Sequence, residues 1–231
     1  MTAIAIDLET IPGQTEAAHK YAQAITKPPA TLKKAESIQK WWNEESEAAI
    51  DENYAKQSFD ALHGEIISIA LTDGDRAWVK CRKQGESELE LLKEFGEVVQ
   101  DWCHIKHSDE ASAWAHQSTP YFIAHNAQFD LPFLWRRMVV LGYKPPFKFP
   151  TPSAREGKDF GCTMVQWAGW GKTVSLKNLA EGLGIPSPKD DIDGSQVFGA
   201  WKAGEYDRIA AYNLRDTDTT MKIWDRMVKV R

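Results

Sequence analysis

The sequence predicts an α/β domain in which one β-sheet is flanked by helices. Three observations favour this class: a strand-like stretch opens the chain at 2–12, a hairpin signature follows at 65–81, and helical and strand-like stretches alternate from there to the end. The 231 residues include 10 Trp and are 42% hydrophobic, which is enough for one substantial buried core. We predict a single domain over 1–231, with 13–63 as a helical insertion after the first strand.

The first strand ends in two acids. Side chains alternate between the faces of a strand, so Asp7 and Glu9 point the same way, about 6.6 Å apart along the chain. Carboxylates that close raise each other's pKa and destabilise a fold unless a cation lies between them. Carboxylate oxygens suit Mg²⁺ or Mn²⁺, and pairs of such ions catalyse phosphodiester cleavage. For an isolated pair of acids the alternative is a strand that runs out into a solvated acidic turn.

The segment 13–63 differs from the rest of the chain in composition. Pro28 and Pro29 interrupt it, and 31–61 is a polar, helix-forming stretch rich in Ala, Glu and Lys that carries Trp41 and Trp42. Three roles are open for this segment: it closes over a substrate, it docks a partner, or it packs as an amphipathic helical hairpin at the edge of the domain.

A hairpin is predicted at 65–81, where an apolar β-branched stretch leads into an Asp-Gly-Asp turn. Apolar residues at helical spacing then predict a helix over 86–104. The polar stretch 104–119 is expected to be a loop. Its histidines lack the ordered spacing of metal ligands and are expected to be solvated: His104, His107 and His116.

A short strand is predicted at 121–124, followed directly by a helix. Asn126 is suited to satisfy the free N–H groups where that helix begins. Asp130 then lies in the opening turn, where it can face the end of the strand; the alternative is a capping or helix-dipole role. A Pro-rich loop at 142–157 leads to a short final strand within 159–167.

Two short helices, at 175–184 and 195–202, precede a long helix at 205–230. Tyr212 and Asp216 are four residues apart in the long helix, so they lie on one face of it.

The loop before these helices contains Gly171-Lys172-Thr173, which is similar to the end of a phosphate-binding loop. The glycine required five places earlier is Gln166, and this excludes the motif. Two readings remain for the loop: it offers Trp170 and Lys172 to a stacked base and its phosphate, or it is an exposed turn.

The acids in these positions, together with the tyrosine, resemble the DEDD, or DnaQ-like, 3′-5′ exonuclease superfamily. The set is Asp7, Glu9, Asp130, Tyr212 and Asp216. A tyrosine four residues before the last Asp is similar to the DEDDy subgroup, because Ala211 stands where the other subgroup has histidine. The helix and turn at 175–186 and the lack of a polymerase domain make the chain similar to stand-alone exonucleases related to the exonuclease domain of family B DNA polymerases.

The resemblance implies an RNase H-like mixed five-stranded sheet flanked by helices. It also implies a metal-dependent 3′-5′ exonuclease that releases nucleoside monophosphates from the 3′ end of single-stranded DNA. By this resemblance two Mg²⁺ or Mn²⁺ ions, roughly 3.5–4 Å apart, are held by the four acids, and Tyr212 orients the attacking water. The implied metal ligands are Asp7, Glu9, Asp130 and Asp216.

Four residues that flank the acids are candidates for holding the terminal nucleotide, and a core or capping role is the alternative for each. They are Leu8, Thr10, Asn126 and Phe129. Three other functions remain open on the same fold: an exoribonuclease acting on RNA 3′ ends, a non-catalytic nucleic-acid-binding module, and a metal nuclease that cuts internally.

The net charge of −5 argues against a protein that coats long duplexes, because that mode depends on many Lys and Arg contacts with phosphates. It is compatible with an enzyme that grips a few nucleotides. The expected partners are the 3′ end of a single strand, with DNA favoured over RNA, and a polymerase or repair protein. The apolar runs are far shorter than the ~18 residues of a membrane span. With three scattered cysteines, typical of reduced thiols, we predict a cytoplasmic protein without membrane contact.

Overall fold

A computed structural model describes residues 1–103, 119–186 and 192–230. Two compact units make up the chain: Met1–Glu9 with Ile66–Arg231, and Thr10–Glu65. The assignment of one domain over 1–231 stays a prediction. The histidines expected to be solvated lie outside the described residues: His104, His107 and His116.

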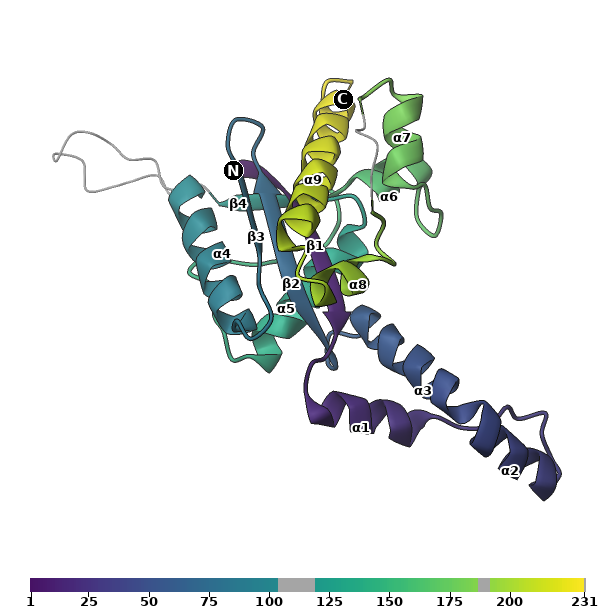
Figure 1. Cartoon of the computed structure of the whole chain (residues 1–231). Helices are drawn as coiled ribbons and strands as arrows, with labels where there is room; N and C mark the ends of the chain where they lie inside the picture. Colours follow the sequence, from purple (N-terminus) through teal and green to yellow (C-terminus); the bar gives the residue numbers. More distant parts are fainter. Residues whose placement is uncertain (104–118, 187–191, 231) are drawn as a thin grey trace, which may run out of the picture. The chain divides into compact units, whose positions relative to one another are not determined.

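Five strands form one mixed sheet in the order β3-β2-β1-β4-β5 (Figure 1). β1 runs parallel to β4, with Ala5 opposite Ile123, and β4 runs parallel to β5, whereas β2 and β3 are antiparallel. The strands are β1 (Thr2–Pro12), β2 (Gly64–Thr72), β3 (Ala77–Cys81), β4 (Pro120–Ala124) and β5 (Gly161–Cys162). The mixed five-stranded sheet and the helices beside it confirm the predicted RNase H-like fold class.

Helices cover both faces of the sheet. Phe95 of α4 contacts Phe122 of β4, with 6.1 Å between the ring centroids, while the next residue, Ile123, packs against Trp224 of α9. Neighbouring residues of a strand point to opposite faces, so α4 and α9 lie on opposite sides of the sheet. The helices of this unit are α4 (Glu88–Cys103), α5 (Ala127–Val140), α6 (Thr163–Ala168), α7 (Leu176–Gly182), α8 (Val197–Lys202) and α9 (Tyr206–Val228).

A buried ion pair joins α4 to α5. The Arg137 guanidinium donates from Nε to Glu88 Oε1 at 2.9 Å and from Nη2 to Oε2 at 2.6 Å. Glu88 Oε1 also accepts the backbone N–H of Ile66 in β2 at 2.9 Å. Both charged side chains are only 6% exposed, so each charge depends on the other for compensation.

The unit Thr10–Glu65 is helical, as the composition of 13–63 predicts. Its elements are α1 (Glu16–Ile25), α2 (Ala35–Glu44), α3 (Ser46–Ala55) and the 3₁₀ helix η1 (Lys56–Phe59). The hydroxyl of Tyr54 donates to the Gly13 carbonyl at 3.0 Å, and the Gln57 amide donates to the Ala18 carbonyl at 2.8 Å. The helical stretch expected at 31–61 is divided into separate helices. Between α2 and α3, Glu45 has φ −122° and ψ −16°, which is not a helical conformation.

The final strand lies within 159–167, as predicted. Within 159–167, strand structure covers Gly161 and Cys162 alone, and the chain enters α6 at Thr163. The Thr163 hydroxyl is bonded to His125 Nδ1 at 2.8 Å, which fixes this turn at the end of β4. At Gly161 an added Cβ would lie 2.7 Å from the Trp224 ring, so the absence of a side chain allows β5 to approach α9.

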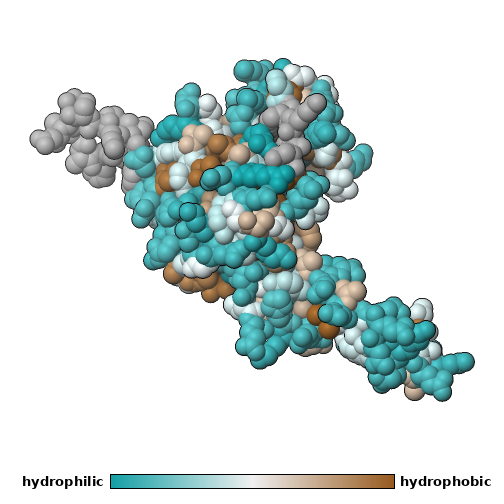
Figure 2. Space-filling model, in the orientation of Figure 1, coloured by the Kyte–Doolittle hydropathy of each residue, from teal (hydrophilic) through white to brown (hydrophobic). Residues whose placement is uncertain are grey.

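Hydrophilic residues predominate on the face of the molecule drawn in Figure 2, with hydrophobic residues scattered between them. Among the described residues, no helix combines the length and the apolar character needed to span a membrane.

Candidate active site

The two strand acids lie on the face of the sheet that α9 covers. Ala5 packs with Trp224 of α9, and the alternation of β1 places Asp7 and Glu9 on the same side as Ala5. Glu9 is 8% exposed. Burial is the largest cause that raises the pKa of each carboxyl well above its usual value, because a buried carboxylate loses its hydration.

Asp130, in the first turn of α5, reaches back to β1. Its carboxylate accepts the backbone N–H of Leu8, the residue between the two strand acids, and also its own backbone N–H. These bonds lower the pKa of Asp130, but burial outweighs them and raises it to about 7. The loss of hydration therefore exceeds the stabilisation that two amide donors provide.

Tyr212 and Asp216 face the same site from α9. The Tyr212 hydroxyl donates a hydrogen bond to the Asp216 carboxylate. Burial, followed by the negative charges of Glu9 and Asp216, raises the pKa of Tyr212 above its usual value. The phenol therefore keeps its proton at neutral pH and acts as a hydrogen-bond donor, not as a base.

The four acids interact with one another. The charges of Asp130, Glu9 and Asp216 each raise the pKa of Asp7, and those of Asp216 and Asp130 raise the pKa of Glu9. The structure thus brings together acids from β1, α5 and α9. In the described residues, no group of three or more His, Cys, Asp or Glu side chains already has the arrangement of a metal site. Metal ligation by these acids therefore stays a prediction.

Two buried polar residues that the sequence analysis did not single out support Asp7. Asn213 donates from Nδ2 to Asp7 Oδ2 at 2.6 Å, and its Oδ1 accepts the Ser68 hydroxyl at 3.0 Å. Both Asn213 and Ser68 are fully buried. A carboxylate can only accept, so these two bonds fix the orientation of the amide. The sequence does contain a signal for both residues. Ser68 is a polar residue inside an apolar strand, and Asn213 directly follows Tyr212 in a helix; buried polar groups of this kind require hydrogen-bond partners.

The donor set fits a hard divalent cation. Carboxylate oxygens are the ligands that Mg²⁺ and Mn²⁺ prefer, and a cation would relieve the repulsion that raises the pKa values of Asp7 and Glu9. The thiol of Cys81 interacts with Glu9, but burial raises its pKa to about 12. A protonated thiol is a poor ligand, so this site offers oxygen ligands.

The four candidate nucleotide contacts differ in their surroundings. Leu8 is 6% exposed and belongs to the core of β1, and the Thr10 hydroxyl donates to the Ser58 carbonyl at 2.6 Å within the unit Thr10–Glu65. Phe129 is partly buried and its ring contacts Phe133, with 5.3 Å between centroids. Asn126 is exposed.

The prediction that Asn126 satisfies free N–H groups of α5 is wrong for its side chain, which makes no capping bond. The backbone of Asn126 adopts φ −114° and ψ 62°, outside the extended conformation that directs a cap side chain toward the helix. Its carbonyl instead accepts the N–H groups of Phe129 and Asp130, at 2.8 and 3.2 Å.

The RNase H-like sheet with acids gathered on one face defines a class of nucleases in which carboxylates act on phosphodiesters. A family model described as "Predicted 3'-5' exonuclease related to the exonuclease domain of PolB" matches residues 109–231. This match covers more than half of the chain, and the protein belongs to this family. No curated protein matches the sequence. The matched region contains Asp130, Tyr212 and Asp216, while Asp7 and Glu9 precede it. Exonucleases of this type generally use divalent metal ions.

Proposed function

We propose that the protein is a 3′-5′ exonuclease that releases nucleoside monophosphates from the 3′ end of single-stranded DNA. The observation that carries this proposal is the convergence of acids from three separate elements, each raising the pKa of another. Like charges that are buried together repel one another and lower the stability of the fold, so the stability of the fold does not explain their arrangement. A phosphodiester hydrolase that binds divalent cations accounts for it.

In this proposal the acids hold the cations: Asp7, Glu9, Asp130 and Asp216. When bound, two divalent ions lower the pKa of water and stabilise the negative charge that develops on the phosphate and the departing 3′ oxygen. The Leu8 N–H orients Asp130, and the Asn213 amide orients Asp7. Buried ligands held in this way lose little freedom when they bind a cation.

Tyr212 serves as a donor in this scheme. Its raised pKa keeps the phenol protonated, so it holds Asp216 and orients the attacking water by hydrogen bonding. We expect Tyr212→Phe to lower kcat roughly 10-fold and to leave the metal affinity unchanged, since the phenol contributes no ligand. Single-turnover kinetics and metal titration separate these effects. A parallel loss of metal affinity would contradict the role as a donor.

Single-stranded DNA is the proposed substrate, and a polymerase or repair protein is the proposed partner. The net charge of −5 favours contact with a short stretch near a strand end over contact along a duplex. The three cysteines are free thiols, as is typical of a reducing compartment, and we propose that the enzyme acts in the cytoplasm.

Time-resolved digestion of 3′- and 5′-labelled single strands of DNA and RNA, with Mg²⁺ and with Mn²⁺, tests the proposal. We expect mononucleotides to appear first from the 3′ end, and a chelator to abolish the reaction. A circular single strand should remain intact. Cleavage of the circle, release from the 5′ end, or no cleavage with either ion would contradict the proposal, and faster digestion of RNA would replace DNA by RNA as the substrate.

A further inference from the structure

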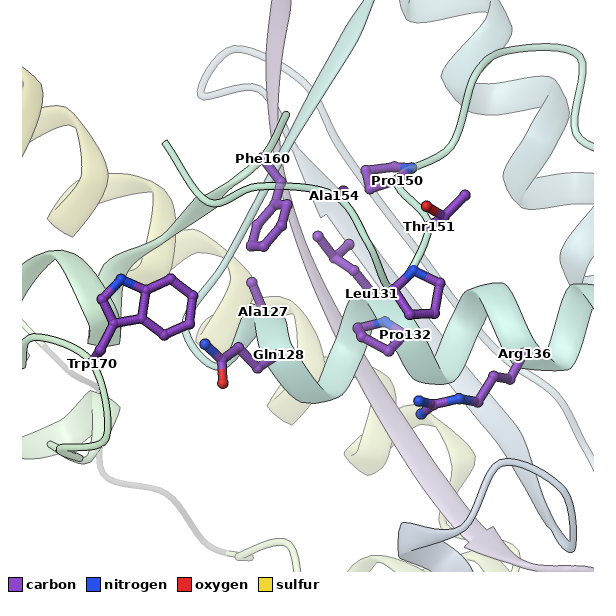
Figure 3. A pocket seen from close by; sticks show the side chains of 11 residues that line it. Ala127, Gln128, Leu131, Pro132, Arg136, Pro150, Thr151, Ala154, Phe160 and Trp170 are labelled. Carbon is purple, nitrogen blue, oxygen red and sulfur yellow. The ribbon is translucent and has the colours of Figure 1, made fainter. Parts of the chain in front are cut away.

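A groove along α5 has no part in the catalytic scheme above. Gln128 and Arg136 of α5 line one side, and Pro150 and Phe160 line the other (Figure 3). Trp170 lies toward one end of the groove and Arg136 toward the other (Figure 3). The cavity volume is about 320 Å³. This is near the lower end of the range for ligand pockets, about 300–1,000 Å³, so the α5 groove suits a ligand of nucleotide size.

The α5 groove and the acids share the first turn of α5 but lie on different sides of it. A helix turns by about 100° per residue, so Gln128 and Asp130 are about 200° apart around the axis. The groove residues Gln128, Leu131 and Pro132 have the spacing of one helical face. Asp130, by contrast, is bonded to the backbone of β1.

Trp170 lies in a turn between two glycines. The indole is 68% exposed, and the glycines on either side, Gly169 and Gly171, have φ of +82° and +74°. This left-handed region favours glycine, so the sequence is suited to the turn that projects the ring. Further along the loop, His125 Nε2 donates to the Val174 carbonyl at 2.8 Å. The indole is therefore exposed on the segment between α6 and α7.

The segment that forms the far wall of the α5 groove is basic. Residues 141–160, between α5 and β5, contain four basic residues and two acidic residues, in a chain whose net charge is −5. In the described part of the chain, neither these four cations nor Arg136 form an ion pair with a carboxylate. The four are Lys144, Lys148, Arg155 and Lys158.

A second hollow continues the α5 groove along this segment. It has a cavity volume of about 350 Å³ and shares Pro150 and Thr151 with the groove. Three of the four cations line it together with one acid, Asp159; the cations are Lys148, Arg155 and Lys158. An apolar groove with an exposed indole thus leads into a positively charged hollow, which is the combination that binds single strands without sequence preference.

We propose that the α5 groove binds the nucleotides that precede the 3′ end of a single-stranded nucleic acid. One base stacks on Trp170, a phosphate is bound by Arg136, and the basic hollow binds the phosphates further from the end. This inference rests on the proposed function, because the 3′ end must lie at the acids. The strand passes over the first turn of α5, which connects the two sites. No bond is made or broken in the groove; it adds affinity for long strands.

The experiment compares variants of two exposed groove residues with matched controls. Trp170→Ala removes the stacking surface, and Trp167→Ala removes an indole that is 57% exposed but lies outside the groove. Arg136→Gln removes a cation from the groove, and Lys93→Gln removes an exposed cation from α4.

The full chain is used throughout. Fluorescence anisotropy in a chelator measures the binding of oligothymidylates from two to about 12 nucleotides long. Hydrolysis of the p-nitrophenyl ester of thymidine monophosphate, with Mn²⁺, reports on the acids alone.

We expect Trp170→Ala to weaken binding of the long strand roughly 10-fold and to leave dinucleotide binding unchanged. Arg136→Gln should reduce the slope of log affinity against log salt concentration by about 0.7, the value for one phosphate contact of a single strand. Ester hydrolysis should stay at the wild-type rate in both variants, and both controls should behave as wild type.

Equal binding of the long strand by wild type and Trp170→Ala would overturn the inference, and so would an equal loss in Trp167→Ala. Loss of ester hydrolysis in Trp170→Ala would also overturn it, since the groove would then act at the acids. Failure of the proposed function is distinguishable: the wild type would hydrolyse neither the ester nor any strand, while the binding series in chelator would still decide whether the groove holds a single strand.

Discussion

Two buried clusters of charge in this protein are built in opposite ways. Between α4 and α5, Glu88 meets Arg137 through two hydrogen bonds, and each charge is compensated by the other. At the proposed active site, acids from β1, α5 and α9 meet one another, and Asp7 and Asp130 accept hydrogen bonds from neutral donors, the Asn213 amide and the Leu8 N–H. Neutral donors orient a carboxylate without neutralising it.

This difference separates a stabilising contact from a functional one. A guanidinium satisfies the carboxylate of Glu88 permanently, so this pair is complete in the protein alone. The charges of the site acids repel one another, which helps to raise the pKa values of Asp7 and Glu9, and a bound cation would relieve this repulsion. Removing charge should therefore have opposite effects on stability at the two clusters.

The largest expected effect is on catalysis. Asp7→Asn or Asp216→Asn should lower the rate of nucleotide release roughly 10³-fold or more, because each removes a charged ligand while keeping the shape and an acceptor oxygen. The melting temperature in chelator should stay the same or rise, since the change also removes repulsion. The measurements are the rate of digestion of a 3′-labelled single strand and thermal unfolding.

Asp225→Asn is the matched control for this loss, because Asp225 is an exposed acid of the same helix α9. This variant should keep full activity. Full activity in Asp7→Asn would instead refute the metal assignment, and a large drop in its melting temperature would show that the acid is structural.

The converse change at the other cluster should be strongly destabilising. Arg137→Met leaves the buried charge of Glu88 without its guanidinium, and we expect the free energy of unfolding to fall by about 3–5 kcal/mol. Lys93→Met breaks a comparable pair, with Glu90 at 2.7 Å, but that pair is exposed and should contribute at most about 1 kcal/mol. Denaturant titration of both variants measures the contrast. Equal losses would mean that burial does not distinguish the two pairs.

The sequence predicts the features that depend on local periodicity. Alternation along the first strand places Asp7 and Glu9 on one face, and the spacing of four residues places Tyr212 and Asp216 on one face of α9. The hairpin β2-β3 and the helix after β4 follow from turn residues and apolar spacing in the same way. The two-residue strand β5 is too short to have a periodicity, so its bounds could not be predicted.

Contacts between distant residues are outside the reach of such patterns. Ser68 and Asn213 are 145 positions apart, and Glu88 and Arg137 are 49 apart. Each of these four residues lies in a helix or strand that was predicted, but the local sequence does not indicate which residue it contacts. The sequence signals only that a buried polar residue needs one. Which acids meet is likewise decided by the sheet order and by α9 crossing the face of β1.

The dependence of stability on pH sharpens the comparison. Burial raises the pKa of Asp130 from 3.8 to about 7, so the folded protein holds a proton that the unfolded chain releases. In chelator, the free energy of unfolding should therefore fall as pH rises from about 4 to 7, by an amount of the order of 3 kcal/mol. Below about pH 4 both states are protonated and the effect disappears.

Asp130→Asn should reduce this dependence, since the amide does not titrate, while Asp7 and Glu9, whose pKa values are also raised, retain their part of it. Thermal unfolding in chelator across this pH range measures both proteins. In the wild type above pH 7, Mn²⁺ or Mg²⁺ should restore the melting temperature by binding the folded state alone. A wild-type protein whose stability rises over the same range would contradict the direction of the shift, and an equal metal response in Asp130→Asn would place the cation elsewhere.

The smallest expected effect concerns the neutral donor that distinguishes the acid cluster from the ion pair. Asn213→Ala removes the amide that holds Asp7, and we expect the affinity for Mn²⁺ to fall 10- to 100-fold, the usual range for a residue that orients a metal ligand. Saturating Mn²⁺ should recover most of the activity, because the acids remain.

Ser68→Ala should have a weaker effect in the same direction, since it acts through Asn213. Thr72→Val removes a buried hydroxyl from the same strand, bonded to the Arg76 carbonyl, and should leave metal affinity unchanged. If all three variants lost metal affinity equally, the chain from Ser68 through Asn213 to Asp7 would be part of the core packing and not a device that positions a ligand.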